Sequence, residues 1–234
     1  MKQKILSFTI FCLLISCAKP TNSDEFIENA TGRYLYASDQ VVEVYFRDKV
    51  LLMTWKGIKD IEPMKLDNDV FFVKEMNEKI TFKTDPDNQE HYLVLIPKDG
   101  ESEIQYKFKK LEKDELTPGE YLDKNEYEKA LKGYLAIKEK DSLDPSINER
   151  EMNRLGYYHL RNNNTEQAIN VLKINAALHP YSDNVYDSLG EAYFKSGDTI
   201  QAIVNYKKSL AIDSGNRRAR NVVERFEKKI DTIN

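Results

Sequence analysis

The chain has 234 residues, of which 41% are hydrophobic and 32% are charged, and its formal net charge is −4. This composition is ordinary for one large domain or two small ones, each able to bury a modest core. A mildly acidic chain without a basic run argues against nucleic-acid binding, so no nucleic-acid partner is expected.

The first residues have the pattern of an export signal. Lys2 and Lys4 precede an almost continuous apolar run over residues 5–15. This run is too short for a bilayer core, which needs about 20 residues, but it suits the core of a signal peptide. It ends at Leu14-Ile15-Ser16-Cys17, which resembles a bacterial lipobox. The resemblance implies that residues 1–16 are a lipoprotein signal peptide and that Cys17 is the lipidated N-terminus of the mature chain.

The cysteine positions favour this interpretation over an ordinary signal peptide followed by an incidental cysteine. Of the 2 cysteines, Cys12 lies in the apolar run and Cys17 lies where a lipobox requires it. Residues 17–29 are then a lipidated tether, with the flexible polar composition of a linker in its first part. We expect a cell-envelope protein held by its lipids. Ala18 favours the outer membrane over the inner one by the sorting rules of enteric bacteria.

Residues 30–112 show the period of two that is typical of strands. Val42, Val44 and Phe46 are spaced two apart, and turn clusters such as residues 85–88 separate short strand-like stretches. The pattern predicts an antiparallel meander, a curled sheet or a small barrel. A single curled sheet needs a lid or closure over its apolar face. Four aromatic residues either pack in its core or line a cavity: Tyr34, Tyr36, Tyr45 and Trp55.

Residues 120–230 have helical periodicity and repeat at an offset of 34 residues. Leu155-Gly156 recurs as Leu189-Gly190, and Ala168 recurs as Ala202. The pattern resembles the tetratricopeptide repeat (TPR), in which these small residues let paired helices approach closely. The predicted fold is therefore α+β: an antiparallel β meander or small barrel followed by an α-helical TPR solenoid.

The repeat limits follow from the same offset. We predict repeats at residues 149–182 and 183–216, a partial earlier repeat at 124–140 and a capping helix at 217–229. Pro118-Gly119 is expected to prevent a regular first helix in the partial repeat.

The two halves together resemble a region of larger proteins. Residues 155–157, 174–175, 179–182 and 184–193 look like the tail of secreted serine hydrolases of the β-lactamase and penicillin-binding class. Residues 32–34, 71–73, 80–82 and 92–95 look like the small β-domain that follows those hydrolase domains. The hydrolase domain itself is missing, so none of its chemistry is carried over to a residue of this chain.

A search for catalytic and metal-binding patterns gives no candidate. The Ser-x-x-Lys pattern occurs at Ser16 and Lys19, which signal cleavage would separate. His91, His159 and His179 lack metal-ligand spacing, and no Gly-x-Gly loop is present. Paired aspartates at 67/69 and 85/87 lie in turns, where they are expected for backbone reasons. We therefore expect no catalytic residues, no metal and no cofactor, and predict that the chain is not an enzyme.

The concave face of the repeats is the better candidate site. In this repeat type the first helix of each pair lines that face. Arginine and aromatic residues, which dominate interface energetics, are frequent there, and an arginine row could grip an acidic peptide. The alternative is that these are solvated helix faces. The predicted partner-binding residues are Arg150, Asn153, Arg154, Tyr157, Arg161, Asp187, Glu191, Phe194, Lys195, Arg218 and Arg225.

Three hypotheses of function follow. The first is a membrane-anchored, non-catalytic envelope scaffold that binds a protein or peptide in the repeat groove, such as a serine hydrolase that it assists. The second is a carrier of a small lipid or glycan in a cavity of the β-half. The third is an enzyme of unknown type, which requires a cleft where titratable groups converge.

Overall fold

The computed structural model describes residues 21–98 and 105–231. The predicted signal peptide, Cys17 and the start of the predicted tether lie outside these residues. Within the described ranges no helix is both long and apolar enough to cross a membrane.

The chain forms two compact units. One comprises Met1–Arg33 and Val42–Lys107 and is called the β unit; the other comprises Tyr34–Val41 and Phe108–Asn234 and is called the helical unit. The predicted domain limits, 30–112 and 120–230, place the whole β-half in one domain. In the structure, the segment Tyr34–Val41 groups with the helices instead.

The strands form one antiparallel, nine-stranded sheet that curls into a half-barrel, and the helices that follow form a TPR-type array. This confirms the predicted α+β class. The strand order is β4-β3-β2-β1-β9-β8-β7-β6-β5, so consecutive strands β4 and β5 form the two edges. The strands are β1 Gly32–Ala37, β2 Gln40–Arg47, β3 Val50–Trp55, β4 Ile58–Ile61, β5 Met64–Lys65, β6 Phe71–Val73, β7 Glu78–Thr84, β8 His91–Ile96 and β9 Gln105–Lys110.

Tight two-residue turns set the register of the first hairpins. Arg47 pairs with Val50, and both intervening residues, Asp48 and Lys49, have positive φ. Positive φ at both central positions matches the right-handed twist of the flanking strands. This turn fixes the register of β2 against β3, in which Val42 and Val44 of β2 are both buried.

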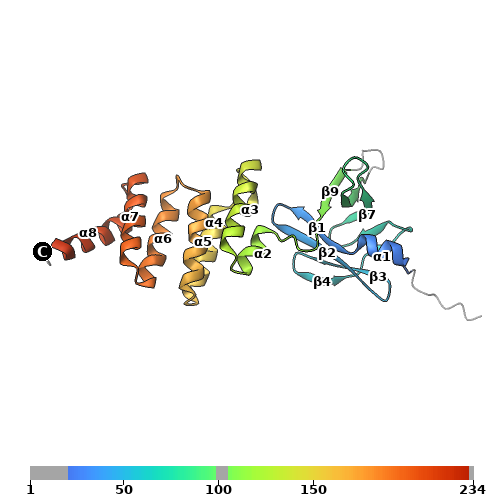
Figure 1. Cartoon of the computed structure of the whole chain (residues 1–234), viewed down its shortest axis with the longest axis horizontal. Helices are drawn as coiled ribbons and strands as arrows, with labels where there is room; N and C mark the ends of the chain where they lie inside the picture. Colours follow the sequence, from blue (N-terminus) through green and yellow to red (C-terminus); the bar gives the residue numbers. More distant parts are fainter. Residues whose placement is uncertain (1–20, 99–104, 232–234) are drawn as a thin grey trace, which may run out of the picture. The chain divides into compact units, whose positions relative to one another are not determined.

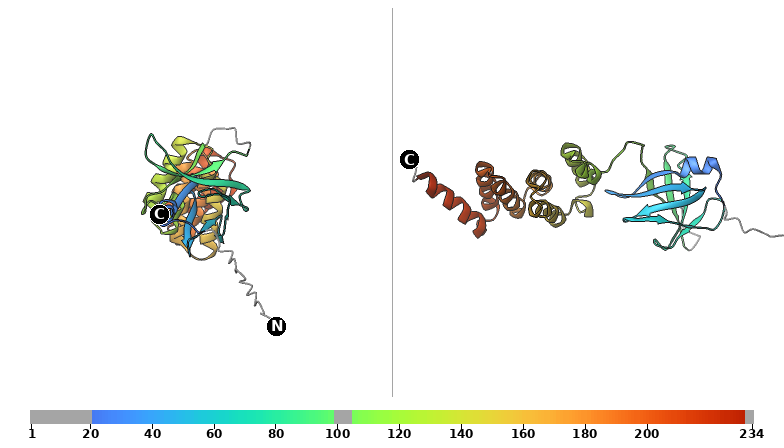
Figure 2. Two further views of the ribbon diagram at one scale, coloured as in Figure 1. Left: turned by 90° about the vertical axis from the view of Figure 1, so that its right-hand side faces the viewer. Right: turned by 90° about the horizontal axis from the view of Figure 1, so that it is seen from below.

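A short N-terminal helix covers the apolar face of the sheet. This helix, α1 (Asp24–Ala30), is capped by the Ser23 side chain. Its Phe26 ring lies 5.7 Å from the ring of Phe71, 6.0 Å from Phe46 and 5.6 Å from Phe82. Figure 2 shows α1 (blue) lying over the curled strands.

The position of α1 corrects part of the predicted tether. Residues 17–29 were expected to form a flexible linker, but the chain is helical from Asp24. The reason is tertiary: burying the Phe26 ring among three other rings offsets the loss of backbone freedom. This helix is the lid that a single curled sheet requires.

The helical unit consists of paired helices stacked in chain order (Figure 1). Helices α4 and α5 lie in the first predicted repeat, α6 and α7 lie in the second, and α8 begins where the capping helix was predicted. The elements are α2 Pro118–Asp123, α3 Tyr127–Lys140, a 3₁₀ turn Pro145–Ile147, α4 Glu149–Arg161, α5 Thr165–Leu178, α6 Asp183–Ser196, α7 Thr199–Ile212 and α8 Arg217–Asp231.

The partial repeat has a first helix, contrary to the prediction. Pro118 stands in the first turn of α2, where a missing N–H costs no helical hydrogen bond. Thr117 and Glu120 form a reciprocal capping box around it. The prediction was wrong because it treated Pro118-Gly119 as a helix breaker rather than as a helix start.

Equivalent positions in the three helix pairs have the same local structure. Each pair turns at one residue with positive φ: Asn125 (61°), Asn163 (60°) and Gly197 (86°). Each second helix also carries a fully buried alanine: Ala130, Ala168 and Ala202. The shared turn and the shared small residue show that α2 and α3 are built like the two later pairs.

The glycines of the first helices are required by close packing. A Cβ atom on Gly156 would lie 2.6 Å from Leu172 Cγ, and one on Gly190 would lie 3.0 Å from Tyr206 Cδ1. Both neighbours are buried in the core, Leu172 at 0% and Tyr206 at 2% exposure. The close approach predicted for both glycines is therefore confirmed.

The turn between β1 and β2, at Ser38 and Asp39, forms hydrogen bonds within the helical unit. Asp39 Oδ1 accepts a hydrogen bond from the Gly119 backbone N–H at 2.7 Å, and its Oδ2 accepts one from the Tyr134 hydroxyl at 2.9 Å. Ser38 donates to Asp144 at 2.5 Å. Burial raises the pKa of Asp39 above its ordinary value, and these hydrogen bonds only partly offset that rise. These contacts explain why Tyr34–Val41 groups with the helices.

Substituting Gly156→Ala should destabilise the protein. In an exposed helix alanine is better than glycine by about 1 kcal/mol. Here the added methyl meets Leu172, so we expect a net loss of about 1–3 kcal/mol in the free energy of unfolding, measured in urea. In the double variant Gly156→Ala/Leu172→Ala the combined loss should be smaller than the sum of the two single losses. A single variant as stable as the parent protein would contradict the packing argument.

Candidate functional site

The predicted site residues lie on α4, α6 and α8, the helices that begin successive repeats. Helix α4 carries five of them, α6 carries four, and α8 carries Arg218 and Arg225. Side-chain hydrogen bonds among Tyr157, Asp187, Glu191 and Arg218 link these three helices to one another. The surface that carries the predicted residues is called the groove below.

The middle of the groove is a cluster of charges. Arg218 on α8 donates hydrogen bonds to Asp187 and, at 2.5 Å, to Glu191, both on α6. Tyr157 on α4 donates to Glu191 at 2.9 Å, and Lys195 approaches Glu191 at 3.4 Å. The guanidinium of Arg218 and the hydroxyl of Tyr157 thus connect α4, α6 and α8.

Burial makes this cluster more than a surface ion pair. The side chain of Asp187 is 9% exposed, that of Glu191 is 20% exposed, and that of Arg218 is 46% exposed. Burial acts to raise the pKa of Glu191, but the Tyr157 hydroxyl and the charges of Arg218 and Lys195 outweigh it, so the net shift is downward. Burial opposes the charge on Arg218, yet its bonds to Asp187 and Tyr157 raise its pKa overall.

These contacts change how several predicted residues are understood. Asp187, Glu191, Tyr157 and Arg218 bind one another, and their shared role in the structure is to hold α4, α6 and α8 together. Tyr206 of α7, a core residue, lies against the same charges, and burial raises its pKa to about 12. A direct role of these residues in binding a partner stays a prediction.

A pocket opens beside the cluster, at the start of α4 and α6. Its volume is about 630 Å³, within the range of ligand sites. Arg150 and Asn153, both predicted, line it, and the Oδ1 atom of Asn153 is buried without a hydrogen-bond partner in the described part of the chain. The other lining residues are Asn148, Glu149, Glu151 and Asn184.

Two of the additional lining residues have structural tasks. The side chain of Asn148 caps α4, and Glu149 accepts a hydrogen bond from Asn184 at 3.0 Å. Asn148 could have been identified as a helix cap from the sequence. Its place beside Asn184 depends on how the two repeats stack.

The remaining predicted residues differ in whether their side chains have interaction partners. Arg154 is paired with Glu151 on its own helix. The Phe194 ring is half-exposed and lies 6.0 Å from the ring of Phe226 on α8. Within the described ranges, the exposed side chains of Arg150, Arg161 and Arg225 have no ion-pair partner. The groove therefore combines a neutralised centre with unpaired positive charges.

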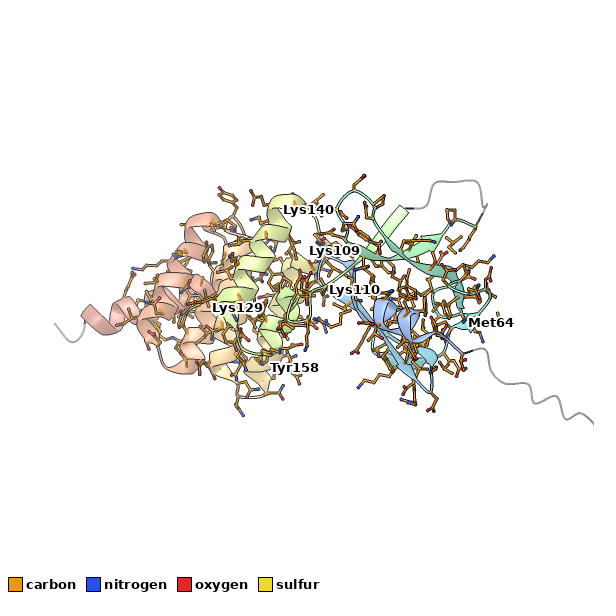
Figure 3. All side chains as sticks on the ribbon, turned by 45° about the vertical axis from the view of Figure 1, so that its right-hand side comes forward. Met64, Lys109, Lys110, Lys129, Lys140 and Tyr158 are labelled. Carbon is orange, nitrogen blue, oxygen red and sulfur yellow. The ribbon has the colours of Figure 1, made fainter. Side chains whose placement is uncertain are left out.

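The three histidines make separate local contacts. His91 contacts Thr84, and the His179 ring contacts the Ile147 carbonyl at 2.8 Å. The His159 ring packs edge-on against Tyr158, which Figure 3 labels in the helical unit. Across the described residues, no group of three or more His, Cys, Asp or Glu side chains could hold a metal ion.

The β unit has a smaller pocket, and its position differs from the predicted cavity. Its volume is about 320 Å³, and Asn22, Val50, Met64 and Phe71 are among its lining residues. None of the four aromatic residues considered for a cavity lines it. Tyr34 is buried in the core, which raises its pKa, and Tyr45 donates a hydrogen bond to Asp60 at 3.0 Å.

Comparisons with known proteins concern the fold alone. No protein-family model and no curated protein matches the chain. The first TPR domain of Spaghetti (RPAP3), solved with the HSP90 peptide SRMEEVD, is 17% identical with a TM-score of 0.35, over 49% of this chain and 87% of that one.

Two further structures are similar over a comparable length. The Yersinia enterocolitica chaperone SycD, in complex with a peptide of the translocator YopD, is 15% identical with a TM-score of 0.34, over 48% of this chain and 88% of that one. MamA is 23% identical with a TM-score of 0.32, over 45% of this chain and 60% of that one.

Removing the guanidinium of the cluster should destabilise the protein. In Arg218→Ala, Asp187 loses its countercharge while it stays largely buried, so we expect a loss of about 1–3 kcal/mol in urea unfolding at neutral pH. Arg225→Ala, on the same helix, should change stability by less than about 0.5 kcal/mol. Equal effects of the two variants would show that the cluster does not stabilise the stack.

The cluster should also make stability depend on pH. The folded-state pKa of Glu191 is lowered, so its contribution is present above the unfolded carboxyl pKa, about 4.3, and is lost as pH falls through the folded value. The difference in unfolding free energy between the parent protein and Glu191→Gln should be largest near neutral pH and shrink below about pH 4. Glu224→Gln, an exposed change on α8, is the control. A Glu191→Gln difference that stays constant with pH would refute the assignment.

Proposed function

We propose that this protein is a non-catalytic scaffold, lipid-anchored in the bacterial cell envelope, that binds a protein or peptide in the groove of α4, α6 and α8. The observation that carries the proposal is the pocket of about 630 Å³ at the start of α4 and α6, which is lined by Arg150, an exposed arginine without an ion-pair partner in the described part of the chain. A fixed wall with unsatisfied polar groups is suited to binding rather than to chemistry.

The groove's groups indicate what it binds. Arg150 and Arg161 are free to form charge-assisted hydrogen bonds with carboxylates. The unpaired Oδ1 of Asn153 is an acceptor, and a buried unpaired polar group costs about 1–3 kcal/mol, which a ligand N–H would relieve. Phe194 offers an aromatic surface at the other end of α6. An extended acidic peptide supplies carboxylates, backbone donors and apolar side chains together.

The proposed anchor rests on Cys17 and the lipobox-like residues before it. If Cys17 carries lipid, five residues join it to Ser23, the cap of α1, and the six steps from one Cα atom to the next span at most about 20 Å. The β unit would then lie close to the membrane. The outer membrane is the proposed location because Ala18 follows the cysteine.

The first partner to test is a serine hydrolase of the envelope. This chain resembles the region that follows the catalytic domain in β-lactamase-like hydrolases, but it lacks that domain. A separately encoded scaffold could assist such an enzyme as the fused region does within one chain.

Crosslinking in intact cells tests the groove. A photoreactive amino acid is placed at Asn184, which lines the pocket, or at Glu166, an exposed position on α5. We expect one envelope protein to be captured from position 184 and not from position 166. The double variant Arg150→Ala/Arg161→Ala should reduce this capture by about tenfold or more.

A matched control removes two positive charges elsewhere. Lys132→Ala/Lys173→Ala changes net charge equally, at exposed positions on α3 and α5, and should leave capture unchanged. Capture that is equal from both crosslinker positions, or that falls equally in both double variants, would exclude a specific groove.

A further inference from the structure

The pocket of the β unit lies between the two edges of the curled sheet. It is lined by Val50 and Leu51 of β3, Pro63 and Met64 near the other edge, and Phe71 of β6, so most of its wall is apolar. Its polar lining residues are Asn22, Glu62 and Lys65. At about 320 Å³ it lies at the lower end of the range for small-molecule sites. A slender apolar group suits it better than a glycan.

The rim of this pocket exposes apolar side chains to water. Met64 on the short edge strand β5 is 58% exposed, and Leu66 immediately beyond it is 46% exposed. Figure 3 labels Met64 on the β unit. An apolar patch bordered by polar residues is typical of a surface that receives an apolar partner.

The N-terminal segment is fastened to the same rim. Asn22 is 5% exposed, and its side chain donates to the Lys49 carbonyl at 2.9 Å. Lys65 donates to Asn22 Oδ1 at 2.8 Å and to the Thr21 carbonyl at 3.2 Å. The chain that leads back to Cys17 therefore starts at the wall of the pocket.

We propose that this pocket receives an acyl chain carried by Cys17 of the same molecule. The proposal rests on the lipidation that is part of the proposed function. Four residues lie between Cys17 and Asn22, and the five steps from one Cα atom to the next span at most about 17 Å, so a lipid on Cys17 is within reach of the pocket. The fastened segment also raises the effective concentration of that lipid above that of any free one.

The pocket would shield one acyl chain when the lipoprotein is away from a bilayer. An acyl chain in water is unfavourable in proportion to its apolar surface. A bilayer offers more apolar contact than this small pocket, so insertion into a membrane would empty it. The β unit would then act on the protein's own anchor rather than as a carrier of a free ligand.

Photocrosslinking of the acylated, full-length protein tests this. The protein is produced in bacteria fed a diazirine fatty acid, purified in mild detergent and mixed with ¹⁵N-labelled protein that lacks the diazirine. Detergent is removed before irradiation, and crosslinked peptides are mapped by mass spectrometry. We expect the acyl chain on Cys17 to crosslink to ¹⁴N peptides that contain Val50, Leu51 or Met64.

Two matched variants test whether the crosslinks depend on the pocket. Met64→Lys places a charge at the pocket mouth and should reduce the pocket crosslinks by about tenfold. Ile58→Lys makes the same change on the other edge strand, at a side chain that is 52% exposed and does not line the pocket, and should leave them unchanged. In phosphatidylethanolamine and phosphatidylglycerol vesicles the parent protein should lose most of these crosslinks to lipid.

Other outcomes overturn the inference in distinguishable ways. An acylated Cys17 whose chain crosslinks elsewhere, or to ¹⁴N and ¹⁵N pocket peptides in proportion to the mixture, excludes the intramolecular site and leaves the groove and the anchor intact. A Cys17 without any acyl chain overturns both the anchor and this inference. Equal losses in the two lysine variants would also exclude the pocket.

Discussion

The helical unit depends on close contact between paired helices at positions where one helix has no side chain. At Gly156 and Gly190 the first helix approaches so closely that Leu172 and Tyr206 fill the space of a Cβ atom. Buried alanines on the second helices allow the same approach from the other side. Each pair cannot bury its apolar faces alone, so stacking produces three successive clusters of buried residues along the unit. The direction of the first helices, and with it the groove, follows from this packing.

In the groove, the residues that stabilise the helix stack differ from those proposed to bind a partner. Arg218, Asp187, Glu191 and Tyr157 satisfy one another across three helices, which keeps the wall in one arrangement. Arginines without ion-pair partners among the described residues, and the buried Oδ1 atom of Asn153, lie outside this cluster. A fixed wall reduces the entropy lost on binding, so the internal ion cluster can support affinity without touching a ligand.

In the β unit, a residue of the N-terminal segment covers the apolar face that a single curled sheet leaves open. Phe26 enters a group of aromatic rings on the sheet, and one of these, Phe71, also forms a wall of the small pocket. The segment that carries the proposed anchor thus completes the core of the unit.

The sequence by itself determined the α+β class, the alternation of strands, the 34-residue repeat and the small residues at helix contacts. These features have local periods or recur at one offset, so they can be read along the chain. It also indicated which helices carry the groove. The N-terminal helix was not predicted, because the segment is mostly polar and a single phenylalanine, Phe26, packs it against the sheet.

Only the tertiary structure decided which side chains meet. Asp39 and Gly119 form a hydrogen bond although they are 80 positions apart in the sequence. The hydrogen-bonded pairs Arg218–Asp187 and Lys65–Asn22 are 31 and 43 positions apart. Such pairs depend on how twisted strands and stacked helices bring distant segments together, and no local pattern encodes that. For this reason the sequence could name Arg218 as a groove residue but could not show that its charge is already neutralised.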